Sequence, residues 1–382
     1  MKIFADQNIP FATEAFSSIG EVSLFDGRTV ANSDLIDADI LLVRSVTKVN
    51  ESLLKNTRVQ FVASATIGTD HIDFEYLTKQ DIPFANAPAS NAISAAEYTL
   101  CALLYFSQLK DFPLSDMQVG IVGYGNVGSR VKQRLDTVGI KSIIFDPPRA
   151  EQFKDVDYTD WESIKKCNVI TAHVPLTKTG KHPTYQMFNE DFFTALPDNS
   201  LFINTSRGDA VDETVLLEIL KTKPLHLILD VWQHEPTINP ELQTQTLIST
   251  PHIAGYSFDG KLRGTEMIYQ ATCEHLAIKL QWQASGVLND HESNTLEFHT
   301  SSKHALWDVL QQAYAITEDS QRLSNTMSLP EAERAMEFDL LRKNYPKRRE
   351  FSYFEVNMDE ATKEQQAILQ KLGFKVNSLL TA

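Results

Sequence analysis

Residues 119–128 read Val-Gly-Ile-Val-Gly-Tyr-Gly-Asn-Val-Gly, which places Gly123, Gly125 and Gly128 in the pattern G-x-G-x-x-G. The apolar residues just before the glycines predict a short buried strand, and residues 127–138 predict the helix that follows. The first glycine permits a tight turn, the second lets a pyrophosphate approach the backbone, and the third lets the helix pack against the strand. The stretch predicts a dinucleotide-binding unit, although the same glycines are also found in turns of other α/β units.

The next predicted strand, 140–145, ends at Asp146, 18 residues after the last glycine of the pattern. A carboxylate there accepts hydrogen bonds from ribose hydroxyls and repels a 2′-phosphate, so we expect NAD rather than NADP. Arg149 follows three residues later, but Pro147 and Pro148 are expected to turn it away. Strand, helix and acid in register favour the dinucleotide interpretation over a simple turn.

The composition is that of a globular protein with two or three domains. The chain has 382 residues, of which 42% are hydrophobic and 22% charged. Its formal net charge of −15 argues against sequence-independent binding to nucleic acids or anionic membranes. Local arginines can still bind an anionic small molecule.

The cysteines and the N-terminus favour the cytoplasm. Cys101, Cys167 and Cys273 are far apart in the sequence, which is typical of a reducing compartment and predicts no structural metal. The first residues predict a strand rather than a signal peptide, and no run of about 18 apolar residues predicts a membrane span.

Strands and helices alternate over residues 1–90, which predicts a mainly parallel sheet. Functional loops in such sheets follow the carboxyl ends of strands, where residues 44–48 and 64–71 fall; both are also compatible with ordinary turns. The expected elements are strands at 3–5, 40–43 and 59–63 and a helix at 10–19 with Pro10 in its first turn.

The remaining pattern predicts three domains. A catalytic domain would consist of residues 1–90 and 257–285, and a Rossmann-type NAD-binding domain, 91–256, would be inserted in it. A long apolar helix over residues 92–109 is expected to carry the chain from the catalytic domain into the NAD-binding domain. A polar linker at 289–294 leads to a C-terminal α+β domain, 286–382, with helices at 305–314, 331–341 and 361–372 and one strand-like piece at 351–356.

Three loops after later strands carry side chains that suit hydride transfer from a 2-hydroxy acid. His252 has a side chain whose pKa lies near neutrality and can accept the hydroxyl proton, and Glu235 can orient the ring. Arg207 can grip a planar carboxylate through two hydrogen bonds. Each residue alone is compatible with a structural role, and His71, His173 and His234 compete as the base. The three fall at one edge of one predicted sheet, which favours a shared site.

The motifs Gly-Tyr-Gly-Asn-Val-Gly, Asn-Thr-Ser-Arg-Gly, Asp-Val-Trp-x-x-Glu-Pro and Pro-His-Ile-Ala-Gly resemble those of the D-isomer-specific 2-hydroxyacid dehydrogenases. The resemblance implies a nucleotide-binding domain inserted in a flavodoxin-like catalytic domain. It also implies that Arg207 binds the substrate carboxylate, Glu235 supports the histidine, and His252 exchanges the proton. Gln233-His234 departs from the common Glu-Gly before Glu-Pro but leaves Glu235 in place.

A closer resemblance is to a group within this family that acts on a phosphorylated 2-hydroxy acid in pyridoxal 5′-phosphate biosynthesis. Residues 43–49, 65–73, 252–257 and 345–351 carry it, the last within what would be a dimerisation domain, so a homodimer is expected. By this resemblance Ser45, Thr66 and Tyr256 bind substrate. The implied NAD contacts are Gly123, Gly125, Asn126, Val127, Gly128, Asp146, Val174, Ser206, Asp230 and Gly255.

A phosphorylated substrate needs cations besides the carboxylate-binding arginine. We expect Arg44 with Ser45 to carry most of the phosphate recognition, with Lys48, Lys261 and Arg263 as further candidates. For the basic run 347–349 we favour a solvated surface over the alternative that Arg348 or Arg349 reaches across the dimer into the partner's cleft. Two rival readings stay open: another D-2-hydroxyacid dehydrogenase, such as a phosphoglycerate dehydrogenase, and a non-enzymatic NAD-sensing scaffold.

Overall fold

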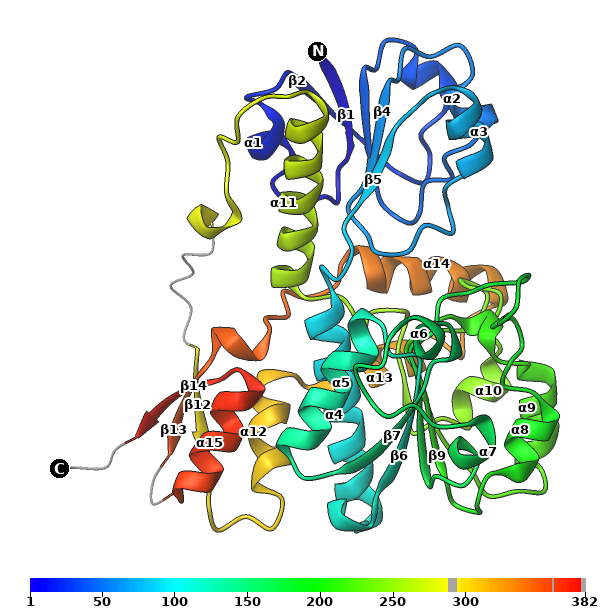
Figure 1. Ribbon diagram of the computed structural model, residues 1–382, viewed down its shortest axis with the longest axis vertical. Helices are drawn as coiled ribbons and strands as arrows, with labels where there is room; N and C mark the ends of the chain where they lie inside the picture. Colours follow the sequence, from blue (N-terminus) through cyan, green and yellow to red (C-terminus); the bar gives the residue numbers. More distant parts are fainter. Residues whose placement is uncertain (288–293, 359–360, 379–382) are drawn as a thin grey trace. The chain divides into compact units, whose positions relative to one another are not determined.

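A computed structural model describes residues 1–287, 294–358 and 361–378 (Figure 1). The chain divides into two compact units. Unit 1 consists of Met1–Asn91 and Ser257–Glu292, and unit 2 consists of Ala92–Tyr256 and Ser293–Ala382. The expected polar linker at 289–294 lies, apart from Asn294, outside the described residues. Among the described residues, no helix is both long and apolar enough to cross a membrane.

Unit 1 is built on a five-stranded parallel sheet with the order β2-β1-β3-β4-β5, which is the flavodoxin-like order expected from the sequence. Alternate side chains of β3 enter two different cores, Ile40 and Leu42 on one face and Leu41 and Val43 on the other. The strands are β1 (Lys2–Asp6), β2 (Glu21–Phe25), β3 (Ile40–Val43), β4 (Phe61–Ser64) and β5 (Phe84–Asn86).

Helices cover both faces of this sheet (Figure 1). Helix α11 (Phe258–His275) packs with α1 (Ala12–Phe16) on one face, and its Ser257 cap accepts a hydrogen bond from the Gly260 amide. The expected helix at 10–19 was too long at both ends. Phe11 adopts a φ of 56°, in the left-handed region, and a right-handed helix cannot run through it. The other helical segments are η1 (Asn32–Leu35), α2 (Glu51–Leu54), α3 (Phe74–Lys79) and η4 (Ala284–Val287).

Unit 2 contains a six-stranded parallel sheet with the order β11-β10-β9-β8-β6-β7. The direction of winding reverses between β6 and β8, and ligands of doubly wound sheets bind at such a reversal. The expected Rossmann-type sheet is therefore confirmed. Its strands are β6 (Gln118–Val122), β7 (Lys141–Phe145), β8 (Val169–Ala172), β9 (Leu201–Asn204), β10 (His226–Leu229) and β11 (Ile248–Ser249).

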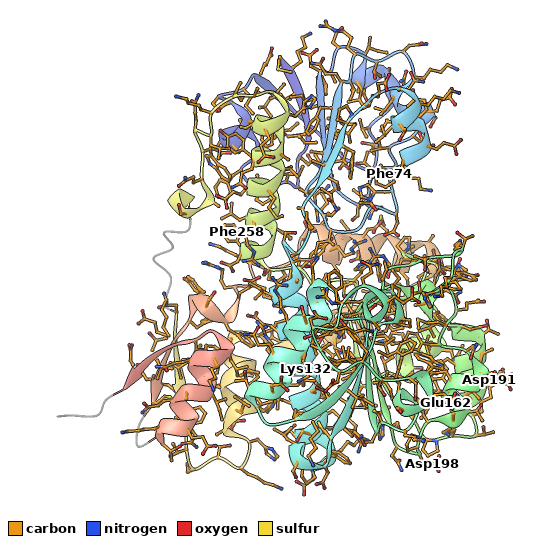
Figure 2. The ribbon with its side chains drawn as sticks, viewed as in Figure 1. Phe74, Lys132, Glu162, Asp191, Asp198 and Phe258 are labelled. Carbon is orange, nitrogen blue, oxygen red and sulfur yellow. The ribbon has the colours of Figure 1, made fainter. Side chains whose placement is uncertain are left out.

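The helices of this sheet include α4 (Ala92–Lys110), which is buried along most of its length as its apolar sequence predicts. It packs beside α5 (Asn126–Thr137), the helix after the glycine motif (Figure 1). Acidic side chains such as Glu162, Asp191 and Asp198 lie exposed at the outer edge of the unit (Figure 2). The remaining segments are η2 (Leu114–Asp116), α6 (Pro147–Gln152), α7 (Trp161–Ile164), α8 (Glu190–Ala195), η3 (Gly208–Ala210), α9 (Glu213–Leu220) and α10 (Pro240–Thr244).

The C-terminal part of unit 2, here called the C-terminal module (residues 294–378), contains a parallel three-stranded sheet with the order β12-β13-β14. The expectation of one strand at 351–356 was wrong. Residues 351–353 form a 3-10 turn, and two further strands are too short and too polar to stand out in the sequence. The elements are β12 (Thr295–Phe298), α12 (Ala305–Ala313), α13 (Ile316–Ser324), α14 (Glu331–Lys343), η5 (Phe351–Tyr353), β13 (Glu355–Met358), α15 (Lys363–Leu372) and β14 (Lys375–Ser378).

The module shares a hydrophobic core with the nucleotide-binding part. Trp307 and Phe351 of the module belong to the same buried cluster as Tyr98 and Leu103 of α4. The module clusters with residues 92–256 in one compact unit. Our expectation that it is a separate third domain stays a prediction.

Candidate active site

The glycine loop after β6 has the geometry of a phosphate cradle. A Cβ atom on Gly128 would lie 2.0 Å from the Gly123 carbonyl oxygen, so helix α5 can start this close only with glycine there. A Cβ on Gly125 would meet no atom within 4 Å among the described residues, which leaves open space above the exposed start of the helix. Backbone amides at a helix N-terminus favour phosphate groups in such a space.

Asp146 lies at the end of β7, where its carboxylate accepts hydrogen bonds from the backbone amides of Tyr124 (2.7 Å) and Arg149 (3.0 Å). A carboxylate has about four lone-pair sites, so it can still accept bonds from ribose hydroxyls. The Arg149 guanidinium binds Asp155 at 2.6 Å and Tyr158 at 3.0 Å. The side chain is thus held by these two partners, and our expectation that the prolines turn it away stays a prediction.

A cavity of about 430 Å³ joins these features within unit 2. Its wall includes the glycine loop, Asp146 after β7, and His173 and Val174 after β8, which flank the reversal of the sheet. The cradle, the acid and the cavity together fit the adenosine diphosphate part of NAD.

His252 and Glu235 form a hydrogen-bonded pair, with 2.8 Å between His252 Nδ1 and Glu235 Oε2. The second carboxylate oxygen accepts from the Trp232 amide at 2.9 Å, which fixes the orientation of the carboxylate. An ionised carboxylate can only accept, so Nδ1 carries the hydrogen and Nε2 is left to exchange a proton. The histidine side chain keeps 34% of its exposure.

The pair stabilises its own charges. Burial alone would lower the pKa of His252, but the charge and hydrogen bond of Glu235 outweigh burial and raise it. Burial alone would raise the pKa of Glu235, but the charge and hydrogen bond of His252 lower it. Arg342, on α14 of the C-terminal module, lowers the pKa of both groups. The site therefore contains a cation that our sequence reasoning did not include.

Asp230 holds the backbone that carries His252. Its carboxylate accepts hydrogen bonds from the amides of Ile253 (2.7 Å) and Ala254 (2.9 Å) and from the Thr250 hydroxyl (2.6 Å). Burial raises the pKa of this carboxyl group. Three donors thus converge on the Asp230 carboxylate. The contact that we expected between Asp230 and NAD stays a prediction.

Arg207 follows β9 and stands directly before η3. Its Nη1 donates to the Ser206 carbonyl at 2.8 Å, and the Ser206 hydroxyl donates to Asn204 at 2.7 Å. A Cβ on Gly208 would lie 1.9 Å from the Trp232 carbonyl carbon, so the arginine loop and the loop of Glu235 are in close contact. The structure therefore brings two of the three catalytic candidates together through their backbones and pairs the third, His252, with Glu235.

The competing histidines have other surroundings. His173 hydrogen-bonds the Thr171 hydroxyl at 2.9 Å and the Thr205 hydroxyl at 3.1 Å, and burial lowers its pKa to about 3. Such a group is a poor proton acceptor. His234 is exposed, and His71 pairs with Ser64 in unit 1.

The substrate candidates of unit 1 lie after β3 and β4. Ser45 is exposed and Arg44 is half-buried. The Thr66 hydroxyl hydrogen-bonds Ser64 at 2.8 Å. Arg263, a further phosphate candidate, donates two hydrogen bonds to the Ser90 carbonyl, at 2.8 and 3.1 Å.

The basic run 347–349 is only partly solvated: Lys347 is exposed, but the two arginines are buried, against our expectation. Arg348 and Arg349 are only 7% and 6% exposed. Arg348 donates to the carbonyl oxygens of Ala254 (3.1 Å) and Ser94 (2.8 Å) and stacks on the Tyr314 ring at 3.7 Å. Arg348 therefore links the C-terminal module to the loop of His252.

Two family models match the chain. The one for the NAD-binding domain of D-isomer-specific 2-hydroxyacid dehydrogenases covers residues 105–254, and one for a domain of unknown function covers residues 287–373. A 3-phosphoglycerate dehydrogenase of Entamoeba histolytica with bound NAD+ superposes with a TM-score of 0.62 at 26% identity, over 74% of this chain and 98% of that one. The fold, the cavity and these matches define the protein as an NAD-dependent oxidoreductase.

Curated relatives extend the likeness to the whole chain. Erythronate-4-phosphate dehydrogenase of Marinobacter nauticus is 42% identical over 98% of this chain and 100% of its own length. The enzyme of that name from Yersinia pestis is 40% identical over 99% and 100%. The chain belongs to the D-isomer-specific 2-hydroxyacid dehydrogenases and, within them, to the family of erythronate-4-phosphate dehydrogenases.

Proposed function

We propose that the protein oxidises 4-phospho-D-erythronate at C2 to 3-hydroxy-2-oxo-4-phosphooxybutanoate with NAD, as a step in pyridoxal 5′-phosphate biosynthesis. The observation that carries the proposal is the likeness to the named relatives over the full length, C-terminal module included. We also propose a homodimer, which the extra module supports, and a cytoplasmic location, which the three free thiols support.

In the proposed reaction, NAD supplies the hydride acceptor when it is bound. Arg207 binds the substrate carboxylate through its planar guanidinium and so orients C2. His252 Nε2 takes the proton of the C2 hydroxyl, while Glu235, on the opposite side of the ring, stabilises the imidazolium that forms. Asp230 keeps the histidine loop in place through the Ile253 and Ala254 amides.

The substrate is tested by NADH formation at 340 nm with 4-phospho-D-erythronate, D-3-phosphoglycerate and D-lactate in parallel, with product removal to pull the reaction forward. We expect a strong preference for phosphoerythronate. Equal or better turnover of phosphoglycerate would leave the family assignment intact but contradict the proposed substrate. Absence of turnover with NAD still bound would favour an NAD-sensing role.

A further inference from the structure

Arg342 lies in the last turn of α14, 86 residues after Tyr256, yet its side chain contacts that tyrosine. Its Nη2 donates to the Tyr256 hydroxyl at 3.2 Å, and the guanidinium carbon lies 5.8 Å from the ring centroid. The Tyr345 ring packs edge-on against the same tyrosine, with 5.9 Å between centroids. The end of α14 thus surrounds a residue that we expect to bind substrate.

The guanidinium has hydrogen-bonding capacity left over. Within residues 1–287, 294–358 and 361–378, its buried Nε has no hydrogen-bond partner. An arginine has five N–H donors in a planar fork, and buried donors are nearly always paired in folded proteins. An unpaired donor on a cation beside the His252–Glu235 pair indicates that an anion completes the site.

The charges around the pair agree with an anionic ligand. Arg342 lowers the pKa of both His252 and Glu235, so its positive charge acts on both members of the pair. The proposed substrate carries a carboxylate and a phosphate, and Arg207 alone offers one guanidinium. The second anionic group therefore needs a second cation, and Arg342 is a cation that unit 2 supplies near the histidine pair.

We propose that Arg342 binds the phosphate group of the substrate beside the Tyr256 hydroxyl, so that the C-terminal module supplies a specificity-determining residue. The inference rests on the proposed function, because it assigns the phosphate of that substrate. Arginine suits the role since its fork matches two phosphate oxygens at once. Arg44 and Ser45 of unit 1 stay candidates for further contacts.

The first test compares 4-phospho-D-erythronate with D-erythronate, which lacks only the phosphate. At a pH at which His252 is neutral in both proteins, we expect kcat/KM of Arg342→Gln for the phosphorylated acid to fall about 10- to 100-fold, the loss of a charged hydrogen-bonding group, while kcat/KM for D-erythronate changes little. Arg342→Lys keeps a point charge and should lose less. Arg334→Gln, on the same helix and hydrogen-bonded to the Leu329 carbonyl, is the matched control and should behave as wild type.

An equal loss for both acids would overturn the proposal, because a purely structural effect through Tyr256 or the histidine pair does not depend on the phosphate. The second test is calorimetric titration of the NAD-loaded protein with inorganic phosphate. We expect binding at least about 10-fold weaker in Arg342→Gln than in wild type or Arg334→Gln. Unchanged phosphate affinity would contradict the assignment.

The titration also separates the two proposals. If wild type fails to oxidise phosphoerythronate, the proposed function falls, while the phosphate affinity still decides the role of Arg342. Circular dichroism and NAD binding show whether each variant is folded. If Arg342→Gln does not fold, the same measurements on Arg342→Lys replace it. The proposal is overturned if that variant keeps both the wild-type ratio of kcat/KM for phosphoerythronate to kcat/KM for erythronate and the wild-type phosphate affinity.

Discussion

The chemistry at the residue scale depends on three charges close together. Glu235 and His252 form a mutually stabilising ion pair, and Arg342 adds a positive charge that favours ionised Glu235 and neutral His252. A neutral imidazole is the form that accepts a proton during oxidation. Burial and Arg342 lower the pKa of His252 and Glu235 raises it, so the balance among the three sets the pH at which the base becomes active.

Replacing Glu235 by glutamine should shift this balance. The variant loses the main cause that raises the pKa of His252, while burial and Arg342, which lower it, remain. The rising limb of kcat/KM against pH for oxidation should move to lower pH. The rate should also fall by about 10²- to 10⁴-fold, because the ring loses the partner that orients it.

Steady-state NADH formation across pH 5 to 9 measures this effect, with a pH-jump protocol to exclude denaturation. If the rising limb of kcat/KM against pH stays at its wild-type position in the variant, the group that titrates is not His252. Normal NAD affinity in the variant is the control for an intact fold.

The residues of this pair could be predicted because each follows a strand of a parallel sheet, where short motifs place side chains at a common edge. Arg342 could not be predicted in this way. It comes from a helix 86 residues beyond its partner Tyr256, and nothing in its neighbourhood distinguishes it from a surface arginine. The sequence offered one clue, namely that a phosphorylated substrate needs cations, and that clue led us to other basic residues.

At the scale of elements, buried ionisable side chains join α4 to the C-terminal module. Glu97 of α4 is 1% exposed and accepts a hydrogen bond from the Phe351 amide at 3.1 Å, with Arg134 at 3.4 Å. Burial and the charge of Glu350 raise its pKa to about 8, although Arg134 and Arg348 oppose the shift. The carboxyl group thus holds a proton at neutral pH in the folded protein.

This pKa predicts how stability depends on pH. Between the ordinary value of 4.5 and about 8, the unfolded chain has released the proton that the folded chain keeps. The free energy of unfolding must then fall as pH rises through this window. Glu97→Gln removes the titration, so its melting temperature should rise relative to wild type, by on the order of 5 °C between pH 5.5 and 8.

Thermal denaturation of both proteins across that range checks the prediction. Glu162→Gln, at an exposed position of unit 2 (Figure 2), is the control and should follow wild type. A constant difference between Glu97→Gln and wild type at all pH values would contradict the raised pKa.

Sequence patterns revealed the elements of this region unevenly. The amphipathic helices α12, α14 and α15 were predicted close to their observed bounds, since a helical period extends over many residues. Strands β12 and β14 have four residues each, too few to establish a period. The buried arginines at 348 and 349 were misjudged because a run of like charges normally lies in solvent. The carbonyl oxygens of Ser94 and Ala254 that bind Arg348 are distant in sequence and could not be foreseen.

For the whole molecule, both parallel sheets followed from the alternation of strands and helices. The features that we expect to bind the cofactor, the glycine cradle and Asp146, all belong to unit 2. NAD should therefore stabilise β6, β7 and β8 directly. At about 100 times its dissociation constant, a ligand adds about 2.7 kcal/mol to the unit that binds it.

Hydrogen exchange with mass spectrometry measures this stabilisation peptide by peptide. We expect slower exchange in residues 118–128 and 141–146 with NAD, and less protection with NADP at the same concentration, because Asp146 repels a 2′-phosphate. Equal protection by the two nucleotides would contradict the assigned role of Asp146.

We propose that the His252–Glu235 pair drives oxidation of 4-phospho-D-erythronate. The most direct measurement is a single-turnover experiment, in which NADH formation at 340 nm is followed after saturating phosphoerythronate is mixed with NAD-loaded wild type or His252→Gln. We predict rapid NADH formation by wild type and a rate about 10²- to 10⁴-fold lower in the variant, at unchanged NAD affinity. Equal rates, or no NADH from wild type with NAD bound, would contradict it.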